Sequence, residues 1–113
     1  MIKVTEIKSA EIKPNPHGVD VRNLYDLEHG QIVHISLNPD QELLKHVTPV
    51  DAAVYILEGE AVVKVGDEEK TVGQDSLVEF PKGIPHSVRN SSKTTLRFLV
   101  IKMPRQSKPT KFL

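Results

Sequence analysis

Two histidines in this chain stand in sequence settings that could support acid–base chemistry. His86 follows the run Pro81-Lys82-Gly83-Ile84-Pro85, and a Pro-x-Gly turn reverses the chain and delivers the histidine at the start of the next strand. His46 stands alone earlier in the chain and is followed two residues later by Thr48. Because an imidazole titrates near neutral pH, either histidine could act as a general acid or base without any cofactor.

Composition narrows the class of protein. The chain has 113 residues, which suits one domain, and it lacks cysteine, so disulfides, thiolate zinc sites and thiol nucleophiles are excluded. Lys and Arg together number 15, as do Asp and Glu, so no overall basic field exists to attract nucleic acid or a membrane. Residues 1–6 lack the apolar run of a signal peptide, and no stretch is long enough to span a bilayer, so we expect a cytoplasmic protein.

Short apolar runs separated by turn residues predict an all-β domain. Five runs rich in β-branched residues predict strands at residues 32–37, 54–57, 61–65, 77–80 and 96–101. Weaker patterns predict further strands at residues 2–7, 12–13 and 19–24. Gly59 and Gly66-Asp67 stand where consecutive hairpins would turn. Prolines bracket residues 41–46, which predicts at most a single helical turn there.

The segment around His86 resembles one of the two motifs of the cupin superfamily. That motif runs from a Gly to Pro-x-Gly-x-x-His and then to an Asn. Pro81, Gly83, His86 and Asn90 match it with the same spacing, and Gly73 fits the opening Gly with two extra residues before the Pro. The resemblance extends over about residues 32–100. It implies that His86 lies on the inner wall of a barrel, where the family uses this histidine as a metal ligand.

The other cupin motif is only partly present. It carries His-x-His, then a Glu, and closes with a Gly. His46 fits the first His and Gly59 the closing Gly, whereas Thr48 holds the second His position and Ala52 or Ala53 holds the Glu position. The resemblance therefore implies His46 and His86 as metal ligands, with Thr48 beside them in the binding pocket. The cofactor it implies is a divalent Mn, Fe, Ni or Zn ion with an incomplete set of protein ligands.

Three other residues are candidates to complete that set. His34 is the candidate third ligand, because it lies on a neighbouring predicted strand. Asp51 is one residue out of phase with the ligand position, and Glu79 lies just before the turn that leads to His86. His17 and His29 lie in turn-like segments and are interpreted as solvated turn residues, with His17 also suited to cap one mouth of the barrel.

The sequence thus predicts one cupin domain over residues 1–113, with the conserved barrel at about 30–102 and a C-terminal arm at 103–113. Its expected fold is a double-stranded β-helix, a jelly-roll-like barrel. We expect the barrel to bind a small molecule, a divalent metal, or both. A metal-dependent dioxygenase or isomerase and a non-catalytic structural barrel stay open as alternatives. The expected partner is a second copy of the chain, docked through the N-terminal strand or the Phe112-Leu113 tail.

Overall fold

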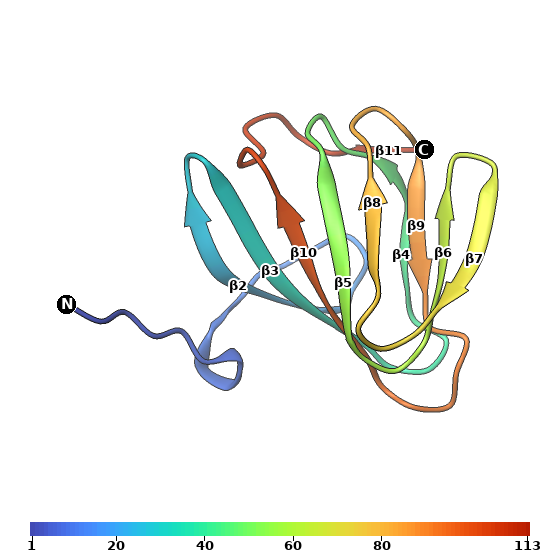
Figure 1. Ribbon diagram of the computed structural model, residues 1–113, viewed down its shortest axis with the longest axis horizontal. Helices are drawn as coiled ribbons and strands as arrows, with labels where there is room; N and C mark the ends of the chain where they lie inside the picture. Colours follow the sequence, from blue (N-terminus) through green and yellow to red (C-terminus); the bar gives the residue numbers. More distant parts are fainter.

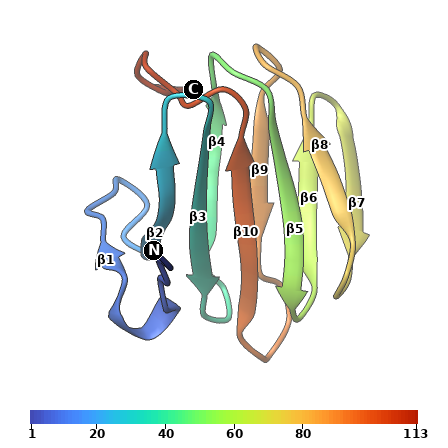
Figure 2. The ribbon, with the colours of Figure 1, turned by 60° about the vertical axis from the view of Figure 1, so that its left-hand side comes forward.

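Strands from almost the whole chain assemble into two antiparallel sheets that face each other (Figure 1). The computed structural model describes residues 1–113. One sheet has six strands in the order β1-β2-β3-β10-β5-β8, and the other has five in the order β11-β4-β9-β6-β7. Figure 2 shows the six-stranded sheet from its β1 side. The strands are β1 (Glu11–Ile12), β2 (Asp20–Leu27), β3 (Gly30–Leu37), β4 (Glu42–Val47), β5 (Ala52–Glu58), β6 (Ala61–Val65), β7 (Glu68–Val72), β8 (Leu77–Phe80), β9 (His86–Arg89), β10 (Leu96–Lys102) and β11 (Lys111–Phe112).

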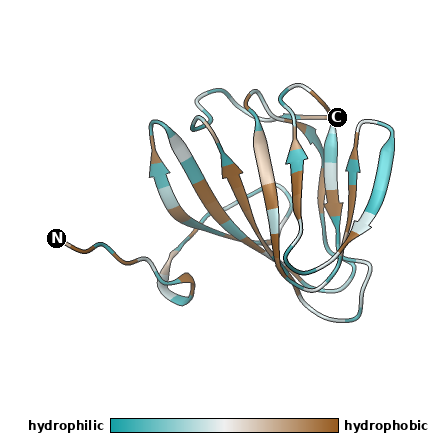
Figure 3. Cartoon of the chain, viewed as in Figure 1, coloured by the Kyte–Doolittle hydropathy of each residue, from teal (hydrophilic) through white to brown (hydrophobic).

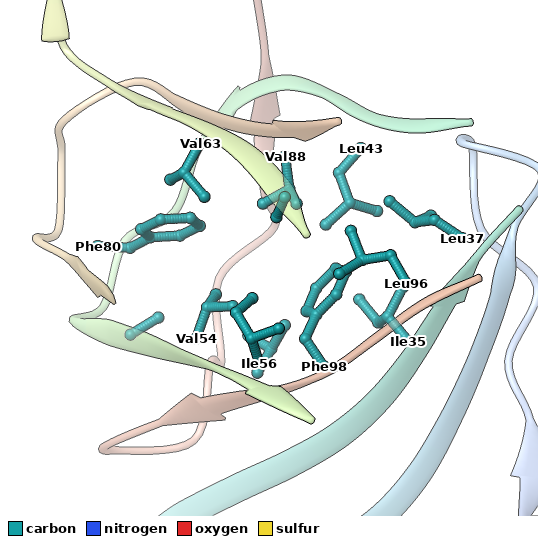
Figure 4. Packing of buried hydrophobic residues seen from close by; sticks show 13 residues of the cluster. Ile35, Leu37, Leu43, Val54, Ile56, Val63, Phe80, Val88, Leu96 and Phe98 are labelled. Carbon is teal, nitrogen blue, oxygen red and sulfur yellow. The ribbon is translucent and has the colours of Figure 1, made fainter. Parts of the chain in front are cut away.

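The hydrophobic core lies between the two sheets, because the strands alternate inward apolar and outward polar side chains. On β10, for example, Leu96, Phe98 and Val100 are buried. Figure 4 shows Leu96 and Phe98 pointing into the space between the sheets. Thirteen buried apolar residues form a single cluster there. The edge strand β7 is exposed and polar (Figure 3), which protects the edge of its sheet from pairing with other chains. The all-β, double-stranded β-helix expected from the sequence is therefore confirmed.

The five strong strand predictions are confirmed, since each lies within or coincides with β3, β5, β6, β8 or β10. The strand predicted at residues 2–7 is wrong. Residues 1–6 have no regular structure and extend away from the barrel (Figure 1), and the short 3-10 turn η1 (Ile7–Ser9) follows them. No strand of either sheet pairs with residues 1–6, and the pairing of β1 with β2 begins only at Glu11.

Most of the segment 41–46, where at most a single helical turn was expected, belongs instead to β4, which pairs with β9. The hairpin predicted at Gly59 is a crossing instead: β5 and β6 lie in different sheets. Gly59 has a φ of +89°, and a Cβ atom there would lie 2.6 Å from the carbonyl oxygen of Thr95. The hairpin predicted at Gly66-Asp67 is confirmed between β6 and β7. No helix in the structure has the length and apolarity needed to cross a bilayer.

Candidate functional site

His46 and His86 lie side by side on the inner face of the five-stranded sheet. They are directly opposite each other on the neighbouring strands β4 and β9. The register of this strand pair shifts between Leu43 and His46. Because of this bulge, both Leu43 and His46 are buried although they stand three residues apart. His86 is the first residue of β9 and follows a tight turn. In that turn Gly83 has a φ of +77°, and the Gly83 N–H donates to the carbonyl oxygen of Thr48.

Three contacts orient the two imidazole rings. His46 Nδ1 lies 2.6 Å from the carbonyl oxygen of Leu44, and His86 Nδ1 lies 3.1 Å from that of Ile84. The two Nε2 atoms face each other at 3.0 Å. The ring of Phe80 stacks against His86 at a centroid distance of 4.3 Å, which limits rotation of that ring. These contacts fix the orientation of both rings so that the two Nε2 atoms point toward each other.

The pair lacks one proton for the contacts it makes. A carbonyl oxygen can only accept a hydrogen bond, so each Nδ1 needs a proton to bond its carbonyl, and the Nε2–Nε2 contact needs another. Two neutral imidazoles carry only one N–H each. As long as both rings are neutral, one of the contacts joins two lone pairs. An additional proton, or another cation between the Nε2 atoms, would satisfy all three.

Burial opposes the uptake of that proton from water. The pKa of His86 is lowered to about 4, first by burial and then by the neighbouring His46. Burial also lowers the pKa of His46, and the Lys102 ammonium lowers the pKa of both rings further. At neutral pH the free protein therefore holds two neutral imidazoles whose geometry suits one more proton.

A cavity of about 300 Å³ opens beside the pair. Much of its wall is apolar, formed for example by Val33, Ile35 and Val100. Its titratable lining groups are all bases, namely Lys13, His17, His46, His86 and Lys102, and no Asp or Glu lines it. This imbalance is local, because acidic and basic residues are equal in number over the whole chain. The cavity combines apolar walls with an excess of positive groups, which suits a small organic anion.

His17 lies at the cavity, although the sequence favoured a solvated turn for it. Asn15 folds the loop that carries His17: its Oδ1 accepts the N–H groups of His17 and Val19. The N–H of Leu44 in turn donates to His17 Nδ1 over 2.9 Å. His17 and His46 have their ring centroids 5.6 Å apart. The alternative interpretation of His17, that it caps one mouth of the barrel, agrees with this position.

The C-terminal segment also reaches the cavity. The strand β11 pairs with β4 of its own barrel, which places Phe112 opposite His46. The Phe112 ring lies 5.3 Å from the His17 ring and 5.6 Å from the His46 ring, centroid to centroid. The sequence predicted a C-terminal arm whose tail docks on a second copy of the chain. The structure lays residues 111–112 along their own chain, across the top of the barrel in Figure 1.

Lys102 is the cavity residue that the sequence reasoning missed most clearly. It ends β10, and its side chain lines the cavity. A signal was present: Leu96, Phe98 and Val100 point inward, and strand alternation puts residue 102 on the same face. Burial lowers the pKa of Lys102, and the nearby Lys13 lowers it further.

Thr48 and Ala52 line the cavity beside the pair, as their motif positions indicated, but neither is a metal ligand. The Thr48 hydroxyl donates to the carbonyl oxygen of Val50 at 3.2 Å. The structure does not bring His34, the expected third ligand, to the pair. His34 Nε2 accepts a hydrogen bond from Arg97, and His34 lines a shallow surface pocket with Arg22, apart from the cavity, because inward and outward residues alternate along β3.

The donor set matches only part of the metal shell that the fold family implies. Two Nε2 atoms 3.0 Å apart suit two adjacent positions of an ion bound at about 2.0–2.1 Å. The two other candidates lie elsewhere: Asp51 accepts the N–H of Lys82, and Glu79 lines a separate surface pocket. No cluster of three or more His, Cys, Asp or Glu side chains could hold an ion. The residues present therefore do not fit a resident metal held by three or more protein ligands.

Comparisons with known proteins agree with the fold. A curated protein of Methanocaldococcus jannaschii, described as uncharacterized, is 28% identical over 102 residues, which cover 89% of this chain and 88% of that protein. A solved structure from Thermus thermophilus shares 31% identity at a TM-score of 0.78, covering 92% of this chain and 99% of the other.

The polyketide cyclase of Streptomyces resistomycificus superimposes over 100% of this chain and 86% of its own, at a TM-score of 0.85 and 20% identity, which shows the fold alone. The family model described as the cupin domain matches residues 25–102, a span that contains both histidines of the pair. Since this match covers well over half of its length, the chain belongs to the cupin domain family.

Proposed function

We propose that this chain binds a small, weakly acidic organic molecule in the barrel cavity, and that the His46–His86 pair takes up the proton that such a molecule releases. The observation that carries the proposal is the 3.0 Å contact between the two Nε2 atoms, because two neutral rings whose Nδ1 atoms donate to carbonyl oxygens have no proton left for it. A carboxylic acid, a phenol or an enolisable carbonyl compound would supply that proton. The resulting anion would lie beside an imidazolium, so the buried charges would compensate each other.

The surroundings of the pair support an anionic partner. Lys13, His17 and Lys102 line the same cavity, and no carboxylate competes for them. The apolar wall raises the strength of each electrostatic interaction by excluding water. The volume of about 300 Å³ restricts the cavity to a small ligand, at the lower end of the range for small-molecule pockets.

The same geometry could also support a reaction. If the bound molecule is an enolisable carbonyl compound, transfer of its α-proton to the pair leaves an enolate in the cavity. Return of that proton to a different carbon would isomerise the compound without any change in oxidation state. This is general acid–base catalysis, for which a base must lie within hydrogen-bond reach of the proton it removes.

Benzoate and benzamide provide a matched test, because they share their size and differ in charge. We expect benzoate to bind at pH 7 with uptake of about one proton per molecule, and benzamide to bind at least about tenfold more weakly. Isothermal titration calorimetry in two buffers of different ionisation enthalpy measures both the affinity and the proton uptake. In His86→Gln the proton uptake should disappear, whereas His29→Gln, in an exposed turn, should behave as wild type.

Equal binding of benzoate and benzamide would refute the proposal, as would benzoate binding without proton uptake. Salicylate and acetylacetone extend the panel to a phenol and an enolisable diketone. Failure of all these acids to raise the unfolding temperature at millimolar concentration would also count against it.

A divalent metal on the same pair is the second candidate, favoured by the convergence of the two Nε2 atoms. Because the protein supplies only two imidazoles, we expect Mn, Fe, Ni or Zn added to the protein to be largely lost on gel filtration. Plasma mass spectrometry should then find well below one equivalent, and less still in His86→Ala. Near one equivalent in wild type, lost in that variant, would establish a completed metal site instead; equal retention in both would show that His86 is no ligand.

We also propose that the chain forms a homodimer through its N-terminal segment. Ile2, Val4 and Ile12 are 90%, 75% and 60% exposed, and residues 1–6 extend away from the barrel (Figure 1). A second copy that covers them would remove this apolar surface from water. Light scattering that gives the mass of a single chain would exclude this assembly.

A further inference from the structure

Lys102 is placed where its amine can meet a molecule in the cavity. It lies at the end of β10, between Gln31 of β3 and Ala52 of β5. All three residues line the cavity that also contains the histidine pair.

No negative charge stabilises the Lys102 ammonium. It takes part in none of the salt bridges of the structure, and no carboxylate lines the cavity. The hydrogen-bond partner of Nζ is the side-chain oxygen of Gln106, a neutral acceptor, at 2.7 Å. Lys13 brings a second positive group to the same cavity. Desolvation and a neighbouring cation are the two conditions that turn a lysine into a nucleophile, because both favour the neutral amine.

We propose that Lys102 forms an imine with a small ketone or aldehyde bound in the cavity. This deepens the proposed function, since it names carbonyl compounds as the ligand class. Imine formation at Lys102 depends on the proposed function only in the later step, in which the histidine pair removes a proton. Lys102 lines the cavity whether or not the pair takes up a proton.

The step balances without any oxidant or reductant. The lone pair of the neutral Nζ attacks the carbonyl carbon, a C–N bond forms, and the oxygen takes a proton to give a carbinolamine. Loss of that oxygen as water leaves a C=N bond to Nζ. The protonated imine withdraws electrons from the adjacent carbon, so His46 or His86 can remove an α-proton to give an enamine. Return of a proton to carbon restores the imine, and addition of water to its C=N bond releases the carbonyl compound and the free amine.

Reductive trapping with pyruvate and cyanoborohydride tests this proposal on the 113-residue chain. Pyruvate combines a ketone with a carboxylate, and the cavity suits both. At pH 7 we expect one adduct per chain, mapped by peptide mass spectrometry to Lys102. It should form at least about tenfold faster than adducts at the exposed Lys82 and Lys108, because burial keeps more of the Lys102 amine neutral and nucleophilic.

Two variants separate reactivity from folding. Lys102→Arg keeps a cation but cannot form an imine, so the fast adduct should disappear while the unfolding temperature stays close to wild type. Gln106→Leu removes the acceptor that stabilises the ammonium, so labelling of Lys102 should become faster. An exposed lysine, by contrast, should label at the same rate in both variants.

The absence of a pyruvate adduct would overturn the proposal, and so would equal labelling of Lys102, Lys82 and Lys108. Persistence of the fast adduct in Lys102→Arg would overturn it as well. The benzoate experiment distinguishes this failure from failure of the proposed function. Benzoate has no electrophilic carbonyl carbon, so its binding with proton uptake would stand without any imine.

Discussion

Replacing Asn90 with alanine is expected to destabilise the protein by about 3 kcal/mol or more, which lowers the unfolding temperature by ~10 °C or more. Asn90 is fully buried at the end of β9. Its Nδ2 donates to the carbonyl oxygens of Leu37 and Thr94 at 2.9 and 2.8 Å, and its Oδ1 accepts from the N–H and hydroxyl of Ser92. Alanine would leave these buried groups without partners and open a void, which are the mechanisms behind large destabilisation.

The exposed Asn38 is the matched control. The contacts of Asn38 run through its backbone, so Asn38→Ala should change the unfolding temperature little. Thermal unfolding followed by circular dichroism compares the two variants directly. If Asn90→Ala and Asn38→Ala have the same unfolding temperature, the hydrogen bonds of Asn90 contribute little net stability and the prediction is wrong.

The Asn90 network also explains why the cupin-like motif ends on an asparagine. In the loop between β3 and β4, the Asp40 N–H donates to the carbonyl oxygen of Asn90, and the Asn90 N–H donates to the carbonyl oxygen of Gln41. The residue therefore fixes the loops at the end of β9 away from its first residue, His86. The motif combines one residue at the cavity with one residue that supports the strand carrying it.

The central strands could be predicted well because the residues of each one carry a local β-strand pattern. Runs such as 61–65 and 96–101 are rich in β-branched residues, and they form β6 and most of β10. The strand β4 was harder to predict, because Glu42–Val47 contains charged residues and a bulge. Its pairing with β9, distant in the sequence, decides its conformation. Pairing between strands that are distant in the sequence leaves little signal in the local residue pattern.

The site was predictable only where a motif marked it. The motif positions identified His46, Thr48 and His86 as candidate site residues, and in the structure all three line one cavity. His17 and Phe112 come from the two ends of the chain, and only the closed fold carries them to the same mouth. No spacing in a sequence reports a contact between segments so far apart.

Acidification from pH 6.5 to about 4 is expected to destabilise the protein steeply. The pKa of His86 falls from 6.5 to about 4 on folding, chiefly through burial. Between these values the unfolded chain binds a proton at this site that the folded chain excludes, so the free energy of unfolding falls as the pH falls. At about 1.4 kcal/mol for each pH unit, His86 alone accounts for roughly 3 kcal/mol of lost stability at pH 4.

The neighbouring groups act in the same direction. Burial lowers the pKa of His17, His34 and His46 as well, and Lys102 adds positive charge to the cavity without any carboxylate to balance it. Urea unfolding at several pH values measures the effect. His86→Gln should flatten the slope between pH 6.5 and 4, and the exposed His29→Gln should not.

Equal slopes in wild type and His86→Gln would show that this ring is not kept neutral by burial. The proposed function predicts a further, opposite effect of ligand. An anion bound beside the pair favours the protonated form, so benzoate should raise the pKa of the pair and stabilise the protein most at the acidic end of this range. Burial therefore opposes protonation of the pair, whereas a bound anion favours it. The stabilisation by benzoate, measured at several pH values, shows which of the two effects on the pKa is larger.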